Sequence, residues 1–190
     1  MFKRWVGLGR IIGSLGAVAV CGAALVATTA GPAYAGCDDS PPLPDGVIRR
    51  VGGNFKGQGL ECTLTPSVTV TQNRSAGQVA VYEVRFKNIE EDTRDIRIYN
   101  ASAPDPTHYK TKILKGAKDL TDKIVAQYPD GKVFGGIASG AKTPTLTVRI
   151  KVRPAAPPGD VTYVHLLGQF TDNAVPATYD GVVAQVQTPA

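Results

Sequence analysis

The 190-residue sequence predicts an all-β protein, an antiparallel β-sandwich. Segments of about five to ten residues alternate apolar with polar side chains, and turns rich in glycine, proline, asparagine and aspartate separate them at near-regular spacing. Because one side of each segment is polar, each sheet is expected to bury one face and to expose the other to water. The roughly 155 residues that follow an N-terminal leader suit a single domain with one core.

Two segments alternate most strictly, as a half-buried strand does. In residues 79–88, VAVYEVRFKN, the apolar side holds Ala80, Tyr82, Val84 and Phe86. In residues 145–153, TLTVRIKVR, the apolar side holds Leu146, Val148, Ile150 and Val152. We expect the strand over 145–152 to be central to the sandwich, with Val148 and Ile150 in the core.

The other expected strands lie in weaker patterns. They are LECTLTPSVTVTQ with a break at Pro66, IRIYN from residue 96, VTYVHLLGQFTDN from 161 and YDGVVAQVQ from 179. Residues 116–127, GAKDLTDKIVAQ, predict at most one helical turn followed by a strand. The expected domains are therefore a signal peptide at 1–35, an irregular proline- and glycine-rich segment at 36–59 with one short strand at 47–51, and the sandwich at 60–190.

Residues 1–35 are typical of an export signal. Basic residues open the segment, no further charge occurs before Asp38, and the apolar stretch Leu15–Ala27 is short for a membrane-spanning helix. Ala33-Tyr34-Ala35 fits the A-x-A pattern, so cleavage is expected between Ala35 and Gly36. Cleavage would leave a secreted or extracellular chain without a membrane span, whereas a retained leader would anchor it at the outer face of a membrane.

The cysteines fit a disulfide in an exported chain. Cys21 would leave with the signal, and the remaining pair, Cys37 and Cys62, is expected to be bonded. An alternative is a lipoprotein that carries lipid on Cys37, since small residues directly precede it. That site prefers an aliphatic residue three places earlier, where this chain has Tyr34.

The charge of the chain excludes an obvious nucleic-acid partner. Its +5 comes from 21 basic and 16 acidic residues, and removing the three basic residues of the leader leaves 18 against 16, or +2. Arg149, Lys151 and Arg153 nevertheless share one side of the strand at 145–153. Such a stripe is either a solvated strand face that protects against edge pairing or a docking site for an anionic polymer of the cell envelope.

No pattern of catalytic or metal-binding residues is present. His108 and His165 lack neighbouring zinc ligands, and Ser139 lacks the flanking glycines of a nucleophile elbow. We therefore expect a protein that is not an enzyme and has no cofactor; a histidine in contact with a carboxylate in a closed cleft would favour an enzyme instead. The acidic run Glu90, Glu91, Asp92 and Asp95 is either a solvated turn or a calcium site, with Arg94 competing as a cation.

An accessory module that binds carbohydrate or another small ligand is the alternative function. Sugar sites on β-sandwiches present flat aromatic rings, and the candidates here are Tyr99, Tyr109 and Tyr128. Tyrosines in strands more often pack half-buried against neighbouring strands.

Residues 66–187 resemble Ig-like modules repeated in bacterial surface and secreted proteins, of the CARDB-like and conserved-repeat type. The run SVTVTQNRSAGQVAVYEVRFKN carries the resemblance through Gly77, Tyr82 and Asn88, and LTDKIVAQYPDGKVFGGIASGAKTPTLTVRIKVRPAAPPGD is similar to their second half. The resemblance implies an Ig-like sandwich that acts as an interaction or structural module, whose partner would be an extracellular protein or an envelope polymer.

Overall fold

The computed structural model describes residues 43–59, 67–102, 104–125, 130–172 and 179–190, all within one compact unit, Tyr34–Ala190. The leader, the cleavage site at Ala35–Gly36 and both cysteines, Cys37 and Cys62, lie outside the described residues. Cleavage, lipidation and the disulfide therefore stay predictions. Within the described ranges, no helix is long and apolar enough to cross a membrane.

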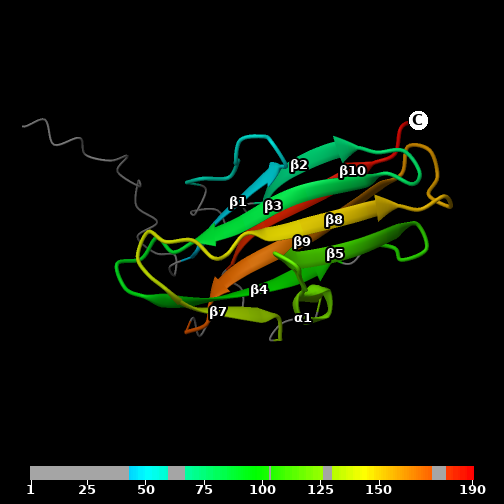
Figure 1. Ribbon diagram of the computed structural model, residues 1–190. Helices are drawn as coiled ribbons and strands as arrows, with labels where there is room; N and C mark the ends of the chain where they lie inside the picture. The colour runs from blue at the N-terminus through cyan, green and yellow to red at the C-terminus, as the bar shows by residue number, and fades with distance from the viewer. Residues whose placement is uncertain (1–42, 60–66, 103, 126–129, 173–178) are drawn as a thin grey trace, which may run out of the picture. The chain divides into compact units, whose positions relative to one another are not determined.

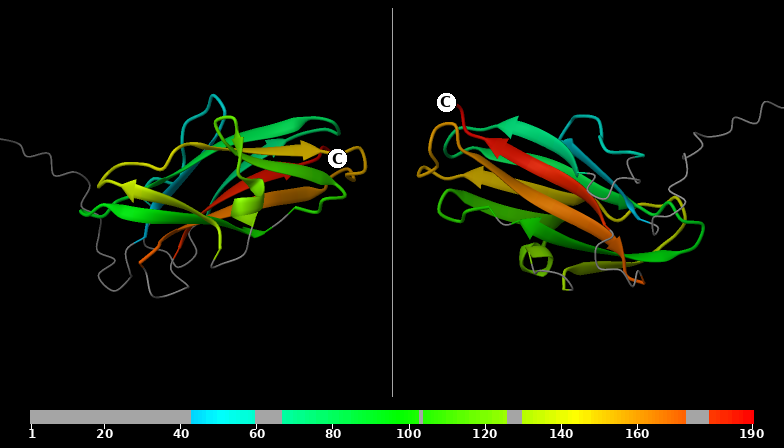
Figure 2. Two further views of the ribbon diagram at one scale, coloured as in Figure 1. Left: turned by 60° about the horizontal axis from the view of Figure 1, so that its bottom comes forward. Right: turned by 180° about the vertical axis from the view of Figure 1, so that it is seen from behind.

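Two five-stranded sheets form the sandwich (Figure 1). The first sheet has the order β1 (Asp45–Arg50), β3 (Val79–Lys87), β8 (Leu146–Val152), β5 (Tyr109–Lys115) and β6 (Lys118–Asp119). The second has the order β2 (Ser67–Asn73), β10 (Asp180–Gln187), β9 (Val161–Phe170), β4 (Arg94–Ser102) and β7 (Lys132–Ile137). One short helix, α1 (Thr121–Val125), packs beside β4 and β5 (Figure 2).

The strand order confirms the predicted Ig-like β-sandwich. The first sheet places β1, β3, β8 and β5 side by side, and the second places β10, β9 and β4 side by side, as in the two sheets of an Ig-like domain. One pair departs from the antiparallel expectation, because β2 runs parallel to β10. These two strands come from opposite ends of the domain, so no hairpin turn forces them to be antiparallel.

The N-terminal boundary of the sandwich differs from the predicted one. The short strand expected at 47–51 is β1, which pairs antiparallel with β3, and its Ile48 is fully buried in the core. The domain therefore begins before residue 60. The sequence analysis placed β1 outside the domain because glycine and proline surround it and its six residues do not alternate between buried and exposed positions.

The core lies between the two sheets and confirms the alternation of the two clearest strands. All four inward residues of β3 and all four of β8 are fully buried. Phe86 fills the space between Gly46 of β1 and Gly168 of β9 in the opposite sheet. A Cβ atom on Gly168 would lie 2.3 Å from Phe86 Cδ1, and one on Gly46 would lie 2.9 Å from Phe86 Cε1. Only glycine leaves room for the ring at these two positions.

Truncating Ile150 to alanine is expected to lower the free energy of unfolding by about 2–5 kcal/mol, because β8 is central and the side chain is fully buried. Chemical denaturation measures the change. Thr147→Ala, on the outward side of the same strand, is the matched control and should change stability by less than about 0.5 kcal/mol. Equal effects of the two substitutions would show that the faces of β8 are wrongly assigned.

Candidate functional site

The outward side of the first sheet gathers basic side chains on two neighbouring strands. Tyr109 and Ile113 of β5 point into the core, so Lys110 and Lys112 between them point outward. The antiparallel register then sets Lys110 opposite Lys151 and Lys112 opposite Arg149. We call these four residues, Lys110, Lys112, Arg149 and Lys151, the basic face; they form two directly opposed cross-strand pairs.

The basic face surrounds a shallow hollow of about 250 Å³. All four of its side chains line the hollow, together with Val79 of β3, which lies opposite Lys151 on the other side of β8. Three adjacent strands therefore build the hollow, and their backbones are fixed by the ladders of the sheet. The cations are held in place by regular structure and not by a loop.

Like charges that face each other across two strands destabilise a sheet. Among the described residues, one acidic partner relieves this repulsion, namely Asp119, whose Oδ2 lies 3.3 Å from Lys112 Nζ. Hydrogen bonds from the side chain and the backbone N–H of Thr121 lower the pKa of Asp119, and Lys112 lowers it further. Lys110, Arg149 and Lys151 form no ion pair within the described part of the chain.

Replacing Lys110 with threonine should therefore stabilise the fold, by about 0.2–1 kcal/mol, because it removes the repulsion from Lys151 and introduces a residue that favours strands. Thermal unfolding at low salt measures the gain, which should shrink as salt screens the pair. Lys142→Thr, at an exposed position outside the basic face, is the control. A loss of stability in Lys110→Thr would show that the two lysines do not repel each other.

Sequence reasoning found half of the basic face. Arg149 and Lys151 were predicted, but Arg153 lies beyond the end of β8, where its N–H donates to the His108 carbonyl. Lys110 and Lys112 were missed because no strand was predicted at 109–115. The signal was present in YKTKILK, where lysines alternate with Tyr109, Thr111 and Ile113, but only two of these three side chains are apolar or aromatic.

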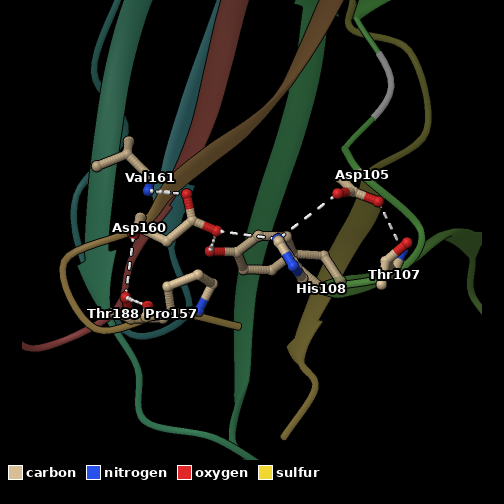
Figure 3. Close-up of polar contacts among 8 residues, drawn as sticks. Asp105, Thr107, His108, Pro157, Asp160, Val161 and Thr188 are labelled. Carbon is tan, nitrogen blue, oxygen red and sulfur yellow. Dashed lines mark hydrogen bonds and ion pairs between the residues drawn. The ribbon is translucent and has the colours of Figure 1, made fainter. Parts of the chain in front are cut away.

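His108 contacts two carboxylates, which sequence reasoning did not predict. Its Nδ1 lies 3.5 Å from Oδ2 of Asp105 and 3.5 Å from Oδ2 of Asp160 (Figure 3). Asp160 Oδ2 also accepts a hydrogen bond from the Tyr109 hydroxyl at 3.0 Å, and Asp105 Oδ1 accepts one from the Thr107 N–H at 2.7 Å. The cluster thus ties the loop before β5 to the loop before β9.

The bonds within this cluster also fix the protonation of its members. Burial, together with the Asp160 carboxylate, raises the pKa of Tyr109 to about 12, so its hydroxyl stays a donor. Hydrogen bonds from Thr107 lower the pKa of Asp105, so that carboxylate stays ionised. The Thr188 hydroxyl donates to the Pro157 carbonyl at 2.6 Å, which connects the C-terminal segment to the loop before β9 (Figure 3).

The acidic turn after β3 is organised by Asn88. Its Nδ2 donates to the carbonyls of Asp92 and Ile137, and its Oδ1 accepts from the Glu90 N–H. Asp95 Oδ1 accepts from the Gly136 N–H. In the described ranges, no group of three or more histidine, cysteine, aspartate or glutamate side chains could hold a metal ion. Ser139 lies in the turn between β7 and β8.

Two of the three predicted sugar-binding tyrosines, Tyr99 and Tyr109, are not available for stacking. Tyr99 and Tyr109 are only 5% and 2% exposed, and Tyr128 lies outside the described residues. Tyr109 is buried because it faces the core from β5. Tyr163 on β9, which sequence reasoning did not select, is 48% exposed. Among the described residues, Tyr163 is therefore the one exposed tyrosine ring, and the aligned aromatic platform that the alternative function needs is not found there.

His165 lies on the outward side of β9, as predicted, but is half-buried there, and burial lowers its pKa below the usual 6.5. Below about pH 6.5 the unfolded chain therefore binds a proton that the folded chain binds less readily, so stability should fall as pH falls. Urea denaturation across this range should show a weaker pH dependence for His165→Gln. An unchanged pH dependence would show that His165 titrates alike in both states.

No family model matches the chain, and no curated protein matches it in sequence. Among solved structures, it is similar to the N-terminal domain of PorA, with 10% identity and a TM-score of 0.46 over 75% of this chain and 96% of that one. It is also similar to an ASH/PapD-like domain of human CEP192, with 10% identity and a TM-score of 0.36 over 80% and 88%. The CupB6 tip adhesin from Pseudomonas aeruginosa is similar too, with 10% identity and a TM-score of 0.37 over 65% of this chain and 41% of that one.

Proposed function

We propose that this chain is an exported, non-enzymatic β-sandwich module that binds an anionic polymer of the cell envelope through its basic face. The observation that carries the proposal is the placement of Lys110, Lys112, Arg149 and Lys151 in two opposed pairs on neighbouring strands. The chain beyond the leader is nearly neutral, with 18 basic and 16 acidic residues, so this cluster is a local feature. Anionic groups that neutralise it would relieve a repulsion that destabilises the free sheet.

The shape of the basic face favours a polymer over a small ligand. Its hollow of about 250 Å³ is smaller than the roughly 300–1,000 Å³ of pockets that enclose small ligands. Lys112, Arg149 and Lys151 are exposed, so their charges are available to a chain that lies across the sheet. Several weak charge contacts along one polymer add up to useful affinity without an enclosed site.

Export supports an envelope location for this binding. The leader at 1–35 and the two cysteines that would remain after its removal, Cys37 and Cys62, are the sequence features of an exported chain. We also propose that the domain is of the CARDB-like and conserved-repeat type, because the sequence runs between residues 66 and 187 resemble those modules. The alternative partner is an extracellular protein with an acidic surface, which would bind the same four basic side chains.

Retention of the purified protein on isolated cell walls tests the proposal. Binding is expected at about 0.05 M salt and release is expected at about 1 M, where the Debye length falls to about 3 Å. A wall fraction stripped of its anionic polymers is the control and should not retain the protein. Retention that is unchanged at high salt, or equal on the stripped wall, would contradict the proposal.

A further inference from the structure

The edge strands β1 and β2 of the two sheets lie side by side at one margin of the sandwich (Figure 1). Two hollows along this margin form a groove. One part is a hollow of about 600 Å³ between Thr69–Thr71 of β2 and the residues 49–56 that end β1 and follow it. A second hollow of about 470 Å³ shares Arg50 and continues to Gln72 and Arg74 at the far end of β2. The two hollows follow the length of one strand.

The edges of the two sheets differ in this groove. The chain folds back along β1, where Ile48 and Lys56 exchange two backbone hydrogen bonds of 3.0 and 2.9 Å. This return covers the outer edge of β1. No described residue pairs in the same way with the outer edge of β2, whose one partner strand in the described ranges is β10.

The register shows which backbone groups of β2 are left for a further strand. The Arg74 N–H donates to the Gln187 carbonyl, and in a parallel ladder such bonds involve every second residue. Val68, Val70 and Gln72 therefore bond toward β10, whereas Thr69 and Thr71 direct their N–H and C=O groups into the groove. Asn73 directs its N–H there as well, while its carbonyl accepts from the Arg74 guanidinium at 2.8 Å.

The groove is basic. Arg50 and Lys56 are exposed in its wall, and their side chains form no hydrogen bond or ion pair within the described part of the chain. Arg49 is paired with Glu83, and Arg74 is held by Gln72 and the Val79 carbonyl. Among the described residues, no acidic side chain lines either hollow. Two cations and the outward backbone groups of β2, which have no partner among the described residues, therefore face the same space.

We propose that this groove binds an extended acidic peptide segment of a partner protein, which adds a strand to β2. Backbone hydrogen bonds to Thr69, Thr71 and Asn73 would hold a stretch of about five residues. Every second side chain of that stretch would point toward residues 50–56, where a carboxylate meets Arg50 or Lys56. The site is separate from the basic face, which lies on the outward side of β5 and β8.

A second copy of this chain fits the groove less well than an acidic segment does. The described strand that a copy would offer, β2 itself, carries no acidic residue, since its sequence is SVTVTQN. Two copies paired edge to edge would bring Arg50 and Lys56 of one near the same residues of the other. These cations thus oppose self-pairing, as charges at exposed edges do, while they favour an acidic strand.

The test is an NMR titration of the full chain with the peptide acetyl-Thr-Glu-Thr-Glu-Thr-Glu-Thr-amide. We expect saturable shifts confined to β2 and residues 50–56, with new protection from hydrogen exchange at the amides of Thr69, Thr71 and Asn73. The matched peptide with lysine for glutamate, and one with N-methylated threonines, should not bind. Equal binding of either control, shifts on the basic face alone, or self-association without peptide would overturn the proposal.

Variants of the protein separate the contributions of charge and backbone. Arg50→Gln with Lys56→Gln should weaken binding about tenfold. Thr71→Pro should abolish binding, because it removes an N–H that points into the groove and leaves the ladder to β10 intact. Thr71→Val, which keeps that N–H, is its matched control and should bind as the original chain does. Binding by Thr71→Pro at full strength would overturn strand addition even where the charge effect is present.

Discussion

Replacing Phe86 with alanine is expected to lower the free energy of unfolding by about 3–5 kcal/mol. The ring is fully buried between the two sheets and is the group that contacts both Gly46 and Gly168. The glycines on either side have no side chain of their own with which to fill the space that the ring leaves. Chemical denaturation monitored by circular dichroism measures the change.

Gly168→Ala tests the same packing from the opposite sheet. Its Cβ would lie 2.3 Å from the Phe86 ring, so the substitution should destabilise by about 1–3 kcal/mol. In a Phe86→Leu background the smaller side chain leaves room for the methyl group, and the penalty of Gly168→Ala should fall. Strictly additive effects in this double-mutant cycle would show that the two residues do not contact each other.

Neutralising the basic face is expected to lower affinity for the anionic envelope polymer about 10³-fold. A basic side chain near an anionic surface contributes about 1 kcal/mol, so changing all four residues to glutamine removes about 4 kcal/mol. The variants are Lys110→Gln, Lys112→Gln, Arg149→Gln and Lys151→Gln, made together. Binding isotherms on isolated cell walls at low salt measure the loss.

The matched control removes charge from exposed positions outside the basic face. Lys123 on α1 and Lys142 before β8 are both exposed, and Lys123→Gln with Lys142→Gln lowers the net charge by two. This control is compared with Lys110→Gln and Lys151→Gln, which change the net charge equally. Affinity losses of the same size in the two double variants would show that net charge governs binding, without a defined face.

Alternation in the sequence predicted the fold wherever a strand has apolar side chains at every second position. β3 and β8 meet this condition with four inward residues each, and their faces were assigned correctly. β5 does not meet this condition, because the polar Thr111 interrupts its inward side. The strand was therefore not predicted, and its outward lysines, Lys110 and Lys112, were missed. β1 was placed outside the domain because its glycine- and proline-rich surroundings resemble a linker.

The candidate site depends on how strands pair with one another, which the sequence of a single strand does not reveal. Arg149 and Lys151 stand out in the sequence, but their pairing with Lys112 and Lys110 follows from the register between β5 and β8. The contact of His108 with Asp160 likewise joins residues 52 positions apart, and loops brought together by the two sheets create it. Long-range pairing of this kind is set by the packing of the whole sandwich and not by local preference.

Differential acetylation of lysines, with the polymer bound and free, tests most directly whether the basic face is the binding site. Mass spectrometry compares the modification of each lysine in the two states. Bound polymer should protect Lys110, Lys112 and Lys151, and should leave Lys123 and Lys142 as reactive as in the free protein. Protection spread evenly over all five lysines, or confined to Lys123 and Lys142, would contradict the account.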